Sequence, residues 1–132
     1  MFTLDELEVY VLAQDFSDKI WFTVEQWPPF PKFGLGRQLT DSSDSISSNI
    51  AGSYGRYFFK ENIKFCFYSR GSILETKNHL LKAAKRNLVD SVTYNELIQE
   101  LKIVHRKLNG YIKFLRKSNY NTNKKTNKPI NE

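Results

Sequence analysis

Apolar residues recur at intervals of three or four along four segments of this chain, and short runs that end helices separate these segments. Such spacing places apolar side chains on one face of an α-helix, which has ~3.6 residues per turn. The four apolar faces must bury one another, and the connections between the segments are short. The pattern therefore predicts an all-α fold, an antiparallel up-and-down four-helix bundle.

Signals for helix starts and ends support this division. Thr3 with Glu6, and Thr93 with Glu96, have the spacing of a capping box, in which side chains satisfy free backbone N–H groups. Residues 27–31 contain three prolines and end the first helix, because proline lacks an N–H and restricts the preceding residue. The third and fourth helices are predicted at about residues 59–87 and 93–117.

The second segment, about residues 35–52, is predicted to be helical although its composition argues otherwise. Serine and asparagine are mediocre residues for a helix interior, so the alternative is a flexible serine-rich linker. We favour a helix because an apolar stripe and a polar stripe share its period. Small serines would let a neighbouring helix approach closely, and Gln38 and Asn49 could form hydrogen bonds across that contact.

Six residues are assigned to packing and polar bonding between helices, not to a ligand site. A buried polar network fixes the register of a bundle, because each unsatisfied member costs about 1–3 kcal/mol. An interior glycine in the third segment indicates close helix packing, since it costs about 1 kcal/mol relative to alanine. The six residues are Gln38, Ser45, Asn49, Gly71, Ser72 and Glu75.

Charge is divided unevenly along the chain. Residues 1–52 hold three Lys/Arg against eight Asp/Glu, whereas residues 53–132 hold seventeen against six. Positive charge steers association with anionic partners, of which nucleic acid is the leading candidate. The alternative is a solvated basic surface without a site. The residues predicted to contact phosphates are Lys82, Lys85, Arg86, Lys102, Arg106, Lys113, Arg116, Lys117, Lys124 and Lys125.

The length and composition predict one domain. Residues 1–117 should form the bundle, and residues 118–132, with almost no apolar residue, should form a basic disordered tail. No run approaches the ~18 apolar residues of a membrane helix, and the start does not resemble a secretory signal. Cys66 is the single cysteine and has no intrachain partner. We therefore expect a cytoplasmic protein without a membrane partner.

Patterns for catalysis, metals and cofactors are missing from the sequence. His79 and His105 lie far apart, and neither belongs to a zinc-binding motif. The glycines near residues 34–36 and 52–55 do not follow a predicted strand, as a phosphate-binding loop requires. Arg70 and His79 are separated more widely than in the helical ribonuclease class. We expect no catalytic residue, no metal and no cofactor; an RNA-cleaving enzyme is kept only as a third hypothesis.

A family pattern runs through the second and third segments. Its members, in order, are Gln38-Leu39, Ser45-Ile46, Asn49-Ile50-Ala51, Tyr54-Gly55-Arg56, and Gly71-Ser72 with Glu75. The pattern closely resembles that of the four-helix-bundle proteins encoded in intervening sequences of bacterial 23S ribosomal RNA genes. The match covers about residues 5–117. Thr40-Asp41 replaces an arginine pair of this pattern, and Gly52-Ser53 replaces its Glu-Gly.

This resemblance implies an antiparallel bundle that assembles into a ring-like homopentamer and has no established catalytic activity. The family is also similar to the accessory protein of diversity-generating retroelements, a basic pentameric bundle that binds a reverse transcriptase and nucleic acid. The partners implied are further copies of the chain, RNA or other nucleic acid, and a reverse transcriptase. These partners rest on analogy of fold.

Two functions follow as hypotheses. The first is a non-enzymatic oligomeric scaffold that binds nucleic acid, most simply structured RNA, through a basic surface of its C-terminal half. The alternative is a protein-interaction adaptor, such as an accessory subunit of a reverse transcriptase or another nucleic-acid enzyme. Exposed aromatic residues such as Trp21, Tyr57 and Tyr68, if gathered on one patch, would favour the adaptor.

Overall fold

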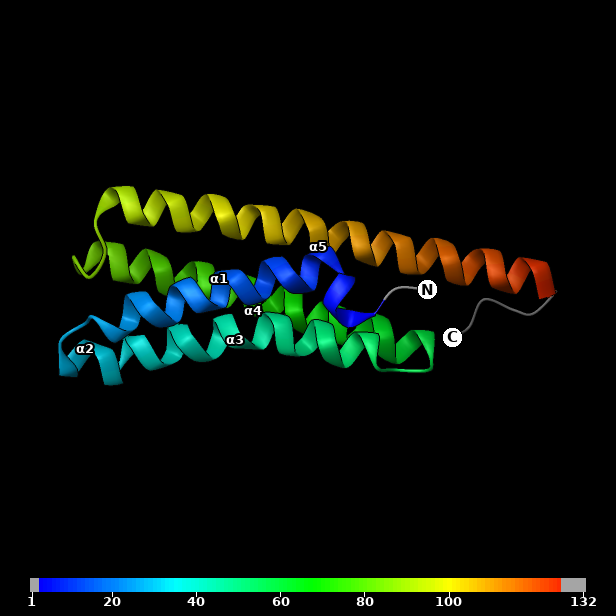
Figure 1. Ribbon diagram of the computed structural model, residues 1–132, viewed down its shortest axis with the longest axis horizontal. Helices are drawn as coiled ribbons and strands as arrows, with labels where there is room; N and C mark the ends of the chain where they lie inside the picture. Colours follow the sequence, from blue (N-terminus) through cyan, green and yellow to red (C-terminus); the bar gives the residue numbers. More distant parts are fainter. Residues whose placement is uncertain (1–2, 127–132) are drawn as a thin grey trace.

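The computed structural model describes residues 3–126, with side chains as far as residue 122, and these residues form a bundle of helices (Figure 1). Within this range the chain contains helices and no strand. The elements are a 3₁₀ turn η1 (Leu4–Glu6) and the helices α1 (Glu8–Glu25), α2 (Pro29–Phe33), α3 (Leu35–Tyr54), α4 (Phe59–Lys85) and α5 (Ser91–Thr126). The all-helical prediction is confirmed.

The four long helices enclose one core. Contacts join α1 to α3, α3 to α4, α4 to α5, and α5 back to α1. In Figure 1 the ribbon passes along the bundle and returns from each long helix to the next. Each predicted segment therefore corresponds to one long helix, and every long helix has two neighbours on which to bury its apolar face.

The apolar stripes predicted from the sequence form this core. Burying one such side chain contributes about 1.5–3 kcal/mol. The largest fully buried apolar side chains are Phe16, Ile20, Leu39, Ile46, Ile50, Ile73, Leu80, Val104 and Leu108.

Among the described residues, none of the helices combines the length and the apolar character that crossing a membrane requires.

The proline-rich run ends the first helix, as predicted, and forms the short helix α2 between α1 and α3. Directly after it, Gly36 lies against the end of α1. A Cβ at Gly36 would lie 2.7 Å from Cγ1 of Val24 and 3.1 Å from the carbonyl oxygen of Pro31. Glycine at this position therefore lets the corner between α2 and α3 pack onto α1.

α3 is a continuous helix in spite of its serines, so the alternative of a flexible linker is wrong. Its buried hydroxyl groups have partners. Ser42 accepts a hydrogen bond from Thr76 of α4 at 2.9 Å, and Ser69 of α4 donates to the carbonyl oxygen of Ile46 at 2.8 Å. Small polar residues thus let α3 and α4 approach closely while their hydroxyl groups stay satisfied.

The helix starts agree in part with the capping patterns. The Thr3–Glu6 box is present, and the Thr3 N–H donates to Glu6 at 2.8 Å, but it caps η1 and not α1. At α5 the capping residue is Asp90, whose carboxylate accepts from the N–H of Thr93 at 2.7 Å. Because α5 begins at Ser91, Thr93 lies inside the first turn, and the predicted Thr93 box is wrong. Aspartate is among the strongest N-cap residues.

α5 extends beyond its predicted end. Residues 118–126 are helical, where the composition predicts a disordered tail. Once a helix is nucleated, each added residue gains one backbone hydrogen bond, so a helix can continue past its last apolar contact. Residues 127–132, and the side chains of Lys124 and Lys125, lie outside the described residues.

Candidate nucleic-acid interface

A basic face runs along the exposed side of α5. Lys102, Arg106, Lys113 and Lys117 are separated by four, seven and four residues, a repeat that places them on one side of a helix. All four are exposed. From the first to the last, the helix rises roughly 22 Å at about 1.5 Å per residue. Arg116, also exposed, lies at the edge of this face.

The remaining predicted cations on α4 are placed differently. Lys82 and Lys85 lie in its last turn, and Arg86 directly follows the helix. Positive charge at a helix C-terminus stabilises the helix dipole, which gives these residues a structural role. The structure thus divides the predicted set into a face on α5 and a group at the end of α4.

Two cations outside the predicted set join the α5 face from α4. Arg70 donates from Nη1 to Oδ1 of Asn109 on α5 at 3.1 Å. Lys77 lines a narrow groove together with Lys102 and His105. Arg70 and Lys77 are seven residues apart, a spacing that places both on the same side of a helix. The sequence does not say which side of α4 faces α5, because packing decides it.

An aromatic ring holds two arginines within this surface. The Arg70 and Arg116 guanidinium carbons lie 4.7 and 5.5 Å from the centroid of the Phe67 ring. Such cation–π contacts contribute about 0.5–1 kcal/mol at exposed sites. Arginines from two helices are therefore held near one another, which reduces the side-chain freedom that binding a phosphate would remove. We call this surface the α4–α5 basic face; it consists of Arg70, Lys77, Lys102, Arg106, Lys113, Arg116 and Lys117.

The titration of His105 reflects this positive environment. Partial burial, followed by the charges of Arg70 and Lys77, lowers the pKa of His105 below 6.5. Nearby cations disfavour a further positive charge, so the imidazole is mainly neutral at pH 7. His105 can then offer hydrogen bonds to an anionic ligand without adding charge.

The side of α5 that faces α1 has a different charge pattern. Lys107 forms a salt bridge with Glu8 at 2.6 Å, and Lys19 forms one with Glu100 at 2.9 Å. These exposed pairs join α1 to α5 and contribute little stability. Lys107 therefore lies outside the α4–α5 basic face, although Lys107 is also a residue of α5.

The assignment of six residues to bonding between helices is corrected by the structure. Ser45 and Asn49 donate to carbonyl groups of α3 itself. Gln38 and Glu75 are exposed, and a Cβ at Gly71 would meet nothing within 4 Å. Of the six residues, only Ser72 is buried. The polar stripe lies beside the helix contact, and the adjacent stripe containing Ser42 makes the bonds to α4.

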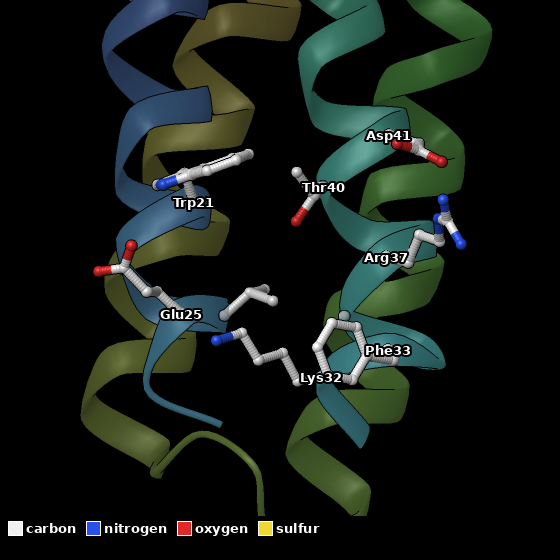
Figure 2. Close-up of a pocket in the computed structure, with 9 residues that line it drawn as sticks. Trp21, Glu25, Lys32, Phe33, Arg37, Thr40 and Asp41 are labelled. Carbon is white, nitrogen blue, oxygen red and sulfur yellow. The ribbon is translucent and has the colours of Figure 1, made fainter. Parts of the chain in front are cut away.

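A pocket of about 580 Å³ lies between α1, α2 and α3, away from the basic face. In Figure 2, Trp21 of α1 and Thr40 of α3 point toward each other across it, and Lys32 and Phe33 belong to α2. Trp21 and Phe33 are 52% and 71% exposed. The pocket also includes Glu25, so its mixture of aromatic rings and opposite charges differs from a phosphate-binding surface.

The three aromatic residues considered as one patch are distributed over the bundle. Trp21 belongs to the pocket on α1, and Tyr57 lies in the connection between α3 and α4. Tyr68 packs against Phe65 on α4, with ring centroids 5.5 Å apart. Tyr57 packs against Phe58, with ring centroids 5.0 Å apart, and Trp21 shares its pocket with Phe33.

The fold and the surface define a class of protein, an all-helical bundle with one strongly basic face. The model of the 23S rRNA-intervening sequence protein family matches residues 5–110, and the chain belongs to this family. The resemblance seen in the sequence is confirmed.

Comparison with solved structures shows the same fold in a relative. The chain is similar to a protein of unknown function from the S23 ribosomal protein family of Bacteroides thetaiotaomicron VPI-5482. The TM-score is 0.75 at 17% sequence identity, and the match covers 80% of this chain and 95% of that chain. The search of curated proteins gives no match.

Proposed function

We propose that this protein is a non-enzymatic scaffold that binds structured RNA through the α4–α5 basic face. One observation carries this proposal: α5 contains no Asp or Glu after Glu100 as far as Thr126, while Lys102, Arg106, Lys113 and Lys117 follow one side of it. A continuous cationic surface without interspersed carboxylates attracts a polyanion along its full length. The description of the family, which refers to 23S rRNA, supports RNA as that polyanion.

The binding mode follows from the chemistry of the face. Lysine and arginine contact backbone phosphates, which fix position without reading the base sequence. Assembly as a homopentamer of antiparallel up-and-down bundles is part of the proposal. Five symmetric copies would present the face repeatedly and raise the effective concentration of each binding event.

The dependence of RNA affinity on salt tests this proposal. Each phosphate contact releases counterions, so log K falls as log salt rises. Removing two cations should make this negative slope shallower by about 2. Fluorescence anisotropy with a labelled RNA hairpin would compare wild type with the Lys102→Gln, Arg106→Gln double variant. The matched control is Lys32→Gln with Arg37→Gln, which removes the same charges beside the α1–α3 pocket.

The control variant should keep the wild-type slope. An equal loss in both double variants would show that net charge, and not the α4–α5 basic face, determines binding. Absence of RNA affinity at low salt would refute the proposal outright.

The pocket containing Trp21 and Phe33 favours a second candidate function, a protein-interaction adaptor. Exposed aromatic residues beside a concave surface are common where proteins bind. The partner would be a reverse transcriptase or another nucleic-acid enzyme. Co-purification of such an enzyme after nuclease treatment, and its loss in Trp21→Ala, would support the adaptor; a complex that nuclease destroys would exclude it.

A further inference from the structure

A polar groove of about 410 Å³ lies between α3 and α4, on the opposite side of α4 from α5. α3 and α4 each supply one wall. The side chains that matter for its chemistry are Gln38, Asp41, Ser45, Ser72, Glu75 and His79.

Four polar residues that carry the family resemblance come together in this groove. Gln38 and Ser45 lie on α3, and Ser72 and Glu75 lie on α4. The bonds between these helices are made by other residues, such as Ser42 with Thr76. Packing of α3 on α4 therefore does not account for the exposed side chains of Gln38 and Glu75.

The charge of the groove is negative. Asp41 and Glu75 bring one carboxylate from each wall. Burial is the main cause that lowers the pKa of His79, and Lys82 lowers it further, while Glu75 acts in the opposite direction. The imidazole is therefore mainly neutral at pH 7. Its Nδ1 atom is buried and has no hydrogen-bond partner among the described residues.

We propose that this groove binds a guanidinium group, which Asp41 and Glu75 contact from opposite walls and to which the Gln38 side-chain carbonyl adds a third acceptor. A guanidinium carries five N–H donors in one plane, so it can bond two separated carboxylates at once. An ammonium group concentrates three donors at one point and fits two facing walls less well. The site goes beyond the RNA-binding proposal, because none of its residues belongs to the α4–α5 basic face.

The two histidines of this chain provide a direct measurement. In ¹H–¹³C spectra of the histidine-labelled full-length protein, the His79 signal reports the groove and the His105 signal reports the basic face. Methylguanidinium and an arginine-containing tripeptide, each added at constant ionic strength, should shift the His79 signal in a saturable way and leave the His105 signal in place. Methylammonium should bind more weakly.

Variants at exposed positions make the test specific. Glu75→Gln and Asp41→Asn should each raise the apparent Kd by about tenfold, as the loss of one charge-assisted hydrogen bond would. Glu61→Gln is the matched control, since Glu61 is an exposed carboxylate of the same helix. RNA affinity and its salt slope should be unchanged in all three variants.

The source of the group follows from the two probes. Tighter binding of the tripeptide would assign an arginine of a partner polypeptide, and equal binding would assign a small guanidino compound. The proposal would be overturned if the His79 signal did not saturate, if methylammonium bound equally well, or if Glu61→Gln weakened binding as much as Glu75→Gln.

Discussion

Gly36 and Gly71 lie in opposite environments, although both are inside long helices. A Cβ at Gly36 would approach Val24, Trp27 and Pro31 at 3.3 Å or less, whereas one at Gly71 would meet no atom within 4 Å. The sequence predicts close packing at Gly71 from its helical context alone. At the scale of a residue, the presence of a glycine inside a helix therefore does not show whether another helix packs closely against it.

Alanine substitutions at these two glycines should act in opposite directions. Gly36→Ala should lower the free energy of unfolding by about 1–3 kcal/mol, because the added methyl group overpacks the corner between α2 and α3. Gly71→Ala should raise it by about 1 kcal/mol, since alanine favours the helix. Urea unfolding at one fixed protein concentration measures both. A destabilised Gly71→Ala would contradict the open environment described for this residue.

At the scale of helices, periodicity predicts the four long elements, because each must bury an apolar stripe. It succeeds for α3, where the stripe outweighs the weak helix preference of serine. It fails at the end of α5, where helix continuation needs no apolar contact. Periodicity also does not show which polar stripe faces a neighbouring helix. It therefore predicts that Ser45 and Asn49 lie at the contact with α4, whereas Ser42 makes that contact.

The start of α5 gives a prediction about pH. Hydrogen bonds from Thr93 lower the pKa of Asp90 below 3.8 in the folded state. The cap thus stabilises the fold fully above the unfolded pKa, and this contribution is lost as the pH falls through the lower folded pKa. Thermal unfolding followed by circular dichroism should show Asp90→Ala below wild type at neutral pH, with the gap narrowing in acid. A gap that does not depend on pH would exclude the carboxylate cap.

At the scale of the whole molecule, the division of charge along the chain becomes a division between surfaces. Carboxylates gather where α1 meets α3: burial, then the charges of Asp41 and Asp18, raise the pKa of Asp44. Cations gather over α4 and α5. The sequence identifies the cations of α5 through their spacing, but it misses Arg70 and Lys77. Their position depends on how α4 rotates against α5, and only the packed core determines that rotation.

The proposed role of the α4–α5 basic face is tested most directly by lysine acetylation of the full-length protein with and without a structured RNA, read out by mass spectrometry. Lys77, Lys102, Lys113 and Lys117 should be acetylated several-fold more slowly when RNA is bound. Lys32 of α2 and Lys107 on the α1 side of α5 should react at unchanged rates. Protection of Lys32 and Lys107 equal to that of Lys102, or no protection at any lysine, would show that the α4–α5 basic face is not the RNA-binding surface.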